Sequence, residues 1–258
     1  MRNLVRVVLA IEAFMLAAAP ALTCAAELQV LSTVALQSVV EDVAPKFEAA
    51  SGHKLKVVFG VGVPLAKRVQ DGEAADLYLG PRGSIDSLIK AAKVVPNSDV
   101  TLARSSVGVA IRRGTPKPDI SNADALKRAL LSAKGISYSN PAFGGTSGVH
   151  FAKVLERLGI AEEMKVKTKF PPEGGLTARF LASGEADIAI QQVGELISVP
   201  EAEVIGTLPG DLNSVTTFAA VIPLAARQAD AARAFIRYLQ SPDAASVMKT
   251  KGLDLPQP

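Results

Sequence analysis

The chain has 258 residues, of which 48% are hydrophobic, 21% charged and only 5% aromatic, and its formal net charge at pH 7 is +3. The charge is nearly balanced, and no basic arm or basic stripe with interleaved aromatic residues is present, which argues against nucleic acid as a partner. The length suffices for one large domain or for two modest lobes.

The first 26 residues have the pattern of a cleavable secretory signal. Arg2 and Arg6 open an apolar stretch over residues 4–22 that ends in small residues. This pattern predicts export, with cleavage after Ala26, and therefore a mature protein in the periplasm. Glu12 within the stretch argues against a membrane-spanning helix, and no later apolar run is long enough to span a membrane.

The only cysteine, Cys24, lies inside this predicted signal. The mature chain would then use neither disulfide bonds nor thiol chemistry. A lipid anchor on Cys24 is the alternative, but Thr23 before it is larger than the small residue that such processing usually requires. We therefore favour ordinary cleavage without lipidation.

Strand-like and helix-like segments then alternate along the chain. A strand is expected at 28–31, a helix at 36–47, a strand at 54–59, a helix at 64–69 and a strand at 76–79. This alternation predicts an α/β fold with parallel sheets and helices on both faces. In such sheets, ligands bind beyond the carboxyl ends of the strands, in the loops that lead into helices.

A glycine-rich loop separates a strand-like run from a helix-like run farther along. Residues 135–139 read as a strand, 142–148 as the loop and 149–159 as a helix. Free backbone N–H groups at a helix start carry partial positive charge, so Gly145, Thr146, Ser147 and Gly148 are candidates to bind an oxyanion. The alternative is a plain turn with a Ser or Thr N-cap.

Two stretches repeat the same order of elements. Residues 65–79 and 176–190 both run from a helix through a glycine and a Glu-Ala pair to an Asp and an apolar strand. We interpret this as two lobes of like construction, joined by the β-rich stretches 102–111 and 215–222. Lobe 1 is predicted to comprise residues 27–104 and 217–258, with the helix at 229–239 returning to it, and lobe 2 to comprise residues 105–216.

Several motifs, in this order along the chain, resemble those of the molybdate-binding periplasmic proteins of ABC transporters. They lie at residues 64–68, 73–76, 140–141, 152–159, 183–187 and 231–242. The resemblance implies a type II periplasmic binding fold, with two α/β lobes on a two-strand hinge that close around an anion held by neutral hydrogen-bond donors. It also implies an ABC transporter permease as partner and a monomeric receptor.

The residues that hold molybdate in that family are only partly matched here. The resemblance implies a serine after the first strand, where this chain has Ala35, with Ser32 and Thr33 just upstream. A second serine cluster would follow the second strand, where Val61 and Gly62 stand. These departures put molybdate in doubt, and small residues at 35 and 62 would enlarge the pocket.

Other polar residues at strand ends complete the candidate binding site. The tyrosine that the family offers falls on Gln192, which follows Gln191 at the end of a predicted strand. Arg82, after the strand at 76–79, is either a clamp for a carboxylate or an exposed surface residue. An arginine at one end and a helix N-terminus at the other suit a small organic anion better than a compact tetrahedral one.

An enzyme is the alternative. The chain is also similar to aconitate isomerase, a periplasmic enzyme of the same superfamily, around residues 116–122, 138–139 and 191–196. If the cleft is catalytic, His150 is the candidate base for an allylic proton shift; otherwise it is a helix-packing histidine. No metal-ligand cluster, P-loop, nucleophile elbow or pair of catalytic acids is recognisable, so we expect no metal and no cofactor.

Overall fold

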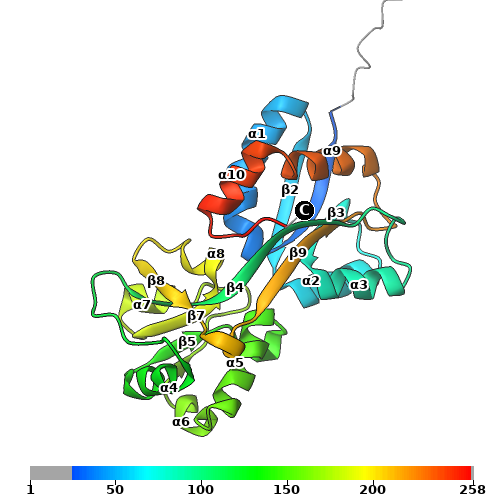
Figure 1. Cartoon of the computed structure of the whole chain (residues 1–258). Helices are drawn as coiled ribbons and strands as arrows, with labels where there is room; N and C mark the ends of the chain where they lie inside the picture. The colour runs from blue at the N-terminus through cyan, green and yellow to red at the C-terminus, as the bar shows by residue number, and fades with distance from the viewer. Residues whose placement is uncertain (1–24, 257–258) are drawn as a thin grey trace, which may run out of the picture.

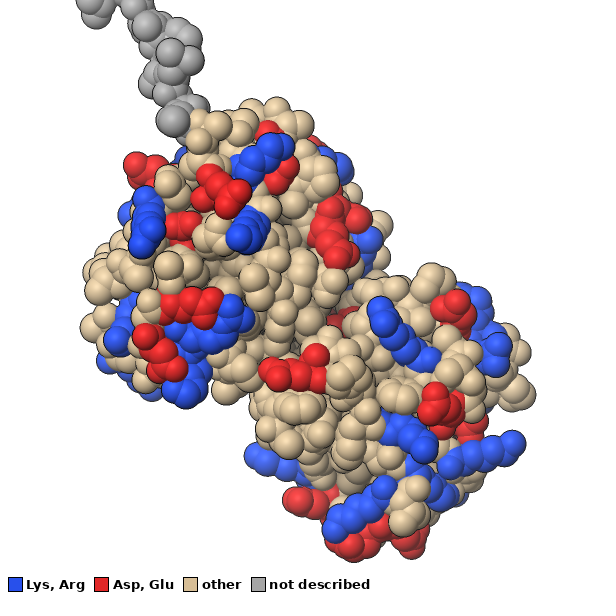
Figure 2. Space-filling view, turned by 180° about the vertical axis from the view of Figure 1, so that it is seen from behind, with Lys and Arg blue, Asp and Glu red and all other residues tan. Residues whose placement is uncertain are grey.

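The computed structural model describes residues 25–256, so nearly all of the predicted signal lies outside the described residues. The described chain forms two lobes of mixed helices and strands, which lie one above the other in Figure 1. Within this part of the chain, no helix is both long and apolar enough to cross a membrane. Lysines, arginines and acidic residues are scattered over both lobes on the face seen in Figure 2, as the balanced composition leads one to expect.

The first lobe is built on parallel strands in the order β2-β1-β3, to which β9 adds in antiparallel orientation. The strands are β1 (Glu27–Thr33), β2 (Lys54–Gly60), β3 (Leu77–Pro81) and β9 (Val215–Val221). Its helices are the 3-10 helix η1 (Val34–Leu36), α1 (Gln37–Ser51), α2 (Gly62–Gln70), α3 (Arg82–Lys90), α9 (Ala229–Leu239) and α10 (Pro242–Thr250).

Helices cover both faces of this sheet, because successive side chains of a strand point to opposite faces. Leu28 and Val30 of β1 belong to the apolar cluster shared with α1, α9 and α10, whereas Leu31 belongs to the cluster shared with α2 and α3. Because β1 and β2 run parallel, the segments that lead from β1 into α1 and from β2 into α2 both leave the sheet at its carboxyl edge.

The second lobe has its own sheet, in the order β8-β4-β7-β5-β6. Its strands are β4 (Val100–Arg112), β5 (Ile136–Tyr138), β6 (Thr168–Lys169), β7 (Ile188–Gln192) and β8 (Ala202–Thr207). Its helices are α4 (Ala123–Ser132), η2 (Pro141–Phe143), α5 (Thr146–Arg157), α6 (Ala161–Lys165), α7 (Arg179–Ser183), α8 (Val193–Leu196) and η3 (Gly210–Leu212). Two apolar clusters again lie on opposite faces of the sheet.

Two long strands connect the lobes. The first part of β4 pairs with β9, from Val100 opposite Ala220 to Ser106 opposite Val215, and the remainder pairs with β7 and β8 of the second lobe. Figure 1 shows β4 and β9 running side by side from one lobe to the other. The predicted two-lobe α/β fold with a two-strand hinge is thus confirmed. The predicted lobe boundaries, between residues 104 and 105 and between 216 and 217, fall at neighbouring residue pairs of β4 and β9. They stay a prediction.

Three details differ from the sequence-based expectation. The sheets are mixed rather than purely parallel, because the two hinge strands cross between the lobes in opposite directions. The helix α5 begins at Thr146, so the second half of the predicted loop is the first helical turn. The helix expected from residue 176 begins only at Arg179, because the backbone N–H groups of Arg179 and Phe180 bond to the carbonyls three residues back, at Leu176 and Thr177, as in a turn rather than an α-helix.

Candidate functional site

A cavity of about 40 Å³ lies between the lobes, at the carboxyl ends of the strands. One water needs about 10–15 Å³ on this measure, so the cavity has room for roughly three water-sized groups, the scale of a small anion. Both lobes contribute to its lining. Among the lining residues are Thr33, Ala35, Val61 and Gly62 from the first lobe, and Gly145, Thr146, Ser147, Gln191, Gln192 and Glu195 from the second.

The first residues of three helical segments line the cavity, two from the first lobe and one from the second. Thr33 precedes η1 and α1, Val61 precedes α2, and Gly145 precedes α5. None of these three N-cap residues accepts a backbone hydrogen bond through its side chain. Since the first N–H groups of a helix have no partner within it, these segments bring uncapped donors and partial positive charge to the cavity.

The start of α5 is held against the preceding loop by close backbone packing. Gly144 adopts φ of +73°, a left-handed conformation that favours glycine. A Cβ at Gly148 would lie 2.1 Å from the carbonyl oxygen of Ser139, so only glycine fits there. Ser147, whose side chain is almost fully buried, and Thr146 consequently face the cavity, whereas Gly148 shapes the site without lining it.

Gly62 has a similar packing role in the first lobe. A Cβ at this position would lie 2.5 Å from Cδ of Pro81, and the buried hydroxyl of Tyr78 donates to the Gly62 carbonyl at 2.8 Å. Burial raises the pKa of Tyr78, so its hydroxyl keeps its proton and remains a donor. The absence of a side chain at 62 thus allows α2 to pack on Pro81.

Gln192 links the two hinge strands to α5. Its amide oxygen accepts from the hydroxyls of Thr216 on β9 and Thr146 on α5, at 2.8 and 3.3 Å, while its amide nitrogen donates to the carbonyls of Ser105 and Ser106 on β4. Gln191 and Gln192 are both buried and line the cavity. Since its amide is engaged on all sides, Gln192 fixes the hydroxyl of Thr146 relative to the hinge.

Glu195 is the one ionisable residue among those that line the cavity within residues 25–256. Its Oε1 accepts from Nε2 of Gln191 at 2.9 Å, and its Oε2 accepts from the backbone N–H of Gln192 at 3.3 Å. Oε1 of Gln191 accepts in turn from the N–H and the hydroxyl of Thr177. Burial raises the pKa of Glu195 to about 8, although both hydrogen bonds that it accepts act in the opposite direction.

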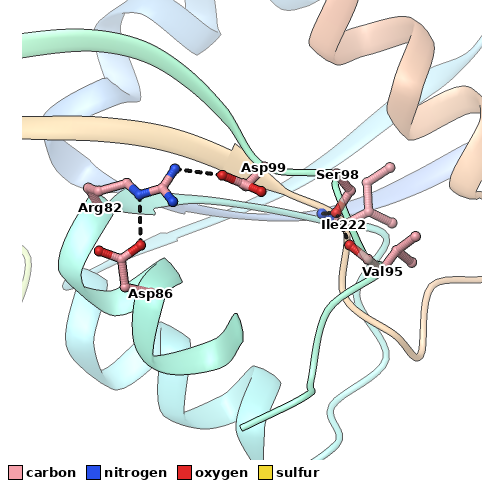
Figure 3. A network of polar contacts seen from close by, with 6 residues as sticks. All are labelled: Arg82, Asp86, Val95, Ser98, Asp99 and Ile222. Carbon is pink, nitrogen blue, oxygen red and sulfur yellow. Dashed lines mark hydrogen bonds and ion pairs between the residues drawn. The ribbon is translucent and has the colours of Figure 1, made fainter. Parts of the chain in front are cut away.

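Arg82 does not reach the cavity. Its Nε donates to Asp86 at 2.7 Å and its Nη1 donates to Asp99 at 2.6 Å, as Figure 3 shows. These contacts tie the first turn of α3 to the segment before β4. The side chain that we considered as a carboxylate clamp is therefore engaged in structural ion pairs.

Ser32 and His150 also lie away from the lining. The side chain of Ser32 is fully buried in β1, and its hydroxyl donates to the carbonyl of Thr33 at 3.2 Å. Nε2 of His150 lies 2.8 Å from the carbonyl oxygen of Leu212, so this ring links α5 to η3. The structure favours the helix-packing interpretation of His150 over a role as the base.

The geometry agrees with what comparison with known proteins finds. Residues 28–254 match the family described as bacterial extracellular solute-binding protein. The chain belongs to this family. It is 32% identical over 253 residues to an aconitate isomerase of Pseudomonas sp, with 95% of each chain covered, and 27% identical over 258 residues to the molybdate-binding protein ModA of Azotobacter vinelandii, with 98% of each covered.

Solved structures of binding proteins share the fold. The periplasmic molybdate-binding protein of Azotobacter vinelandii superposes with a TM-score of 0.74 at 21% identity, covering 89% of this chain and 100% of that one. The sulfate-binding protein SubI of Mycobacterium tuberculosis H37Rv gives a TM-score of 0.71 at 18% identity, covering 90% and 88%. The predicted resemblance to molybdate-binding proteins and the type II periplasmic binding fold are thus confirmed.

In this solute-binding protein, most of the residues nominated from the sequence do gather at one cavity, and one important residue was not nominated. The candidates brought together are Thr33, Ala35, Val61, Gly62, Gly145, Thr146, Ser147, Gln191 and Gln192; those left outside are Ser32, Arg82, Gly148 and His150. Glu195 was missed, because a glutamate one turn after a strand end reads as an exposed helix residue. Its signal was the capping-box spacing from Gln192.

Proposed function

We propose that this member of the family is a periplasmic receptor of an ABC importer, which binds a small anion between its lobes and delivers it to a permease. The observation that carries the proposal is the convergence of three uncapped helical N-termini, from both lobes, on a cavity whose lining holds no lysine or arginine from residues 25–256. Backbone N–H groups bind anions well in such sites, without a counter-charge.

An organic acid anion is the preferred ligand over molybdate. The positions where molybdate-binding relatives are expected to offer hydroxyls hold Ala35, Gly62 and Gln192. The amide of Gln192 is engaged with Thr146 and Thr216, and Gly62 is packed on Pro81. The lining residues that carry a hydroxyl are Thr33, Ser139, Thr146 and Ser147, and Thr33 alone comes from the first lobe, so a tetrahedral oxyanion would meet few side-chain hydroxyls on that side.

A thermal-shift panel on residues 27–258 tests this assignment. Molybdate, tungstate, sulfate and a series of small mono-, di- and tricarboxylates are each added to the purified protein, because a ligand that binds only the folded state raises the melting temperature by mass action. We expect carboxylates to give the larger shifts. Submicromolar affinity for molybdate in calorimetry would refute the preference, and no shift with any anion would refute the receptor assignment itself.

The second candidate is an isomerase that moves an allylic proton on a tricarboxylate. It is favoured by the 32% identity with aconitate isomerase over 95% of both chains and by Glu195, an ionisable group at the cavity. Such a reaction removes a proton from one carbon and returns one at the far end of the allyl system, so it needs one group that exchanges protons near neutral pH. The cavity would have to widen by opening of the lobes to admit a tricarboxylate.

Incubation with cis-aconitate in deuterated water separates the two candidates. Proton NMR follows the vinyl signal of the substrate for formation of trans-aconitate and for deuterium incorporation. Turnover would establish the isomerase, and a lack of both signals at stoichiometric protein would leave the receptor.

A further inference from the structure

The cavity has an unusual charge arrangement for a site that receives anions. Among the residues that the structure describes, no cationic side chain lines it, and the one ionisable group in its lining, Glu195, is an acid. If Glu195 were ionised, its carboxylate would repel the ligand across a buried, poorly screened space. In its neutral form, the same group has a hydroxyl to donate.

The hydrogen bonds around Glu195 leave room for that hydroxyl. Gln191 donates to Oε1 and the N–H of Gln192 donates to Oε2, and neither of these groups can accept a proton from the carboxyl. Only 5% of the residue is exposed. A proton on Oε2 therefore has the cavity side as its available direction, where the ligand would supply the acceptor.

No charged neighbour compensates the carboxylate. Helix α8 packs against β4, β7, β8 and η1, of which β7 and η1 carry no charged residue. On the other two strands, Arg112 is exposed, Arg104 lies in the part of β4 that pairs with β9, and Glu203 pairs with Lys117. Lys251, whose backbone lies near Gly194, pairs with Asp42. Among the described residues, no ion pair reaches Glu195.

We propose that Glu195 is the proton-exchanging residue of the cleft, which is neutral when an anion is bound and donates its hydroxyl to that anion. This inference rests on the proposed anion-binding function. It adds that the site recognises its ligand partly through a carboxylic acid, and that anion binding takes up a proton from solution whenever Glu195 is ionised beforehand. Burial, which raises the pKa of Glu195 to about 8, brings this coupling into the physiological range.

The test measures anion affinity against pH. The probe is whichever of sulfate, molybdate and cis-aconitate raises the melting temperature, since all three are fully ionised between about pH 7 and pH 9.5. The dissociation constant of the unmodified protein should stay level to about pH 8 and then rise about tenfold for each pH unit. Calorimetry at about pH 9, in two buffers of different ionisation enthalpy, should find close to one proton taken up for each anion bound.

The Glu195→Gln variant keeps the shape of the side chain and retains a neutral hydrogen-bond donor, the amide NH2. Whatever its affinity at about pH 6.5, that affinity should remain level up to pH 9.5, and anion binding should involve no proton uptake. Glu203→Gln, which removes an acid from an ion pair outside the cavity, should retain the full pH dependence. The proposal is overturned if Glu195→Gln still shows the pH-dependent loss, or if the unmodified protein shows none.

A second measurement decides the matter even if no probe binds. With ¹³C-labelled glutamate carboxyl groups, the one resonance that disappears in Glu195→Gln belongs to Glu195. Titration of this resonance near pH 8 supports the proposal independently of any ligand. Titration near pH 4 overturns it, whereas a failed anion panel with titration near pH 8 refutes the proposed function alone.

Discussion

Gly148 packs directly against Ser139. A Cβ at position 148 would lie 2.1 Å from the carbonyl oxygen of Ser139 and 3.0 Å from its Cβ. This contact sets where α5 begins, and with it the positions of Thr146 and Ser147 at the cavity. The site on the second lobe thus depends on a glycine whose own atoms do not line it.

Gly148→Ala should therefore destabilise the protein and weaken anion binding together. Overpacking of this kind typically costs about 1–3 kcal/mol, because the neighbouring backbone must move. The free energy of unfolding from urea titration and the thermal shift with a bound anion measure the two effects. The matched control is Gly83→Ala in the first turn of α3, where an added Cβ meets nothing within 4 Å; a control that loses as much stability as Gly148→Ala would contradict this explanation.

Ser147→Ala should weaken anion binding and leave stability nearly unchanged. The Ser147 hydroxyl is buried at the cavity beside the N-terminus of α5, and loss of one hydrogen bond to a charged ligand costs on the order of 1–3 kcal/mol. Titration calorimetry with the anion selected by the thermal-shift panel measures the effect. Arg82→Ala provides the contrast, since its ion pairs to Asp86 and Asp99 are partly exposed and lie outside the cavity. An equal loss of affinity in Arg82→Ala would show that Arg82 does contribute to anion binding, as a carboxylate clamp would.

The repeated sequence pattern predicted the fold well because it reflects a repeated structural need. Asp76 and Asp187 occupy equivalent places in the two repeated stretches, residues 65–79 and 176–190, just before β3 and β7. Asp76 accepts from the backbone N–H of Gln29, and Asp187 accepts from that of Lys134, so each acid fixes the start of a strand against its neighbour. Local constraints of this type are visible in a sequence, and so the two lobes could be predicted.

The candidate site was less predictable because its decisive features are non-local. Arg82 follows a strand end, as many ligand-binding residues do, but Asp99 reaches it from a segment 17 positions away in the chain. Glu195 looks like a surface residue until the burial of α8 between both lobes is known. Sequence spacing located the strand ends; which side chains face the cavity depended on packing partners that spacing does not reveal.

Ligand binding should make the protein more compact, since β4 and β9 connect its two lobes and the cavity lies between them. Small-angle scattering of residues 27–258 should show a smaller radius of gyration with saturating anion than without it. Light scattering on the same samples should give a monomer in both states. An unchanged radius at saturation would contradict closure about this hinge.

Glu195→Gln should make the ligand-free protein more resistant to alkaline pH. Burial raises the pKa of Glu195 from its ordinary value of 4.5 to about 8, so within this window the folded chain retains a proton that the unfolded chain has released. Its contribution to stability is therefore fully present below about pH 4.5 and is lost as pH rises through about 8. The loss is on the order of a few kcal/mol, since each pKa unit corresponds to about 1.4 kcal/mol.

Urea unfolding at about pH 5, 7 and 9 measures this effect as the difference between the unmodified protein and Glu195→Gln. The difference should grow in favour of the variant from pH 5 to pH 9, because glutamine has no proton to lose. Glu203→Gln is the control, since a hydrogen bond from Lys117 lowers the pKa of Glu203 and its contribution is lost toward acid pH instead. Parallel pH profiles for the unmodified protein and Glu195→Gln would mean that Glu195 ionises normally in the folded state, which would remove the basis for proton exchange in the cleft.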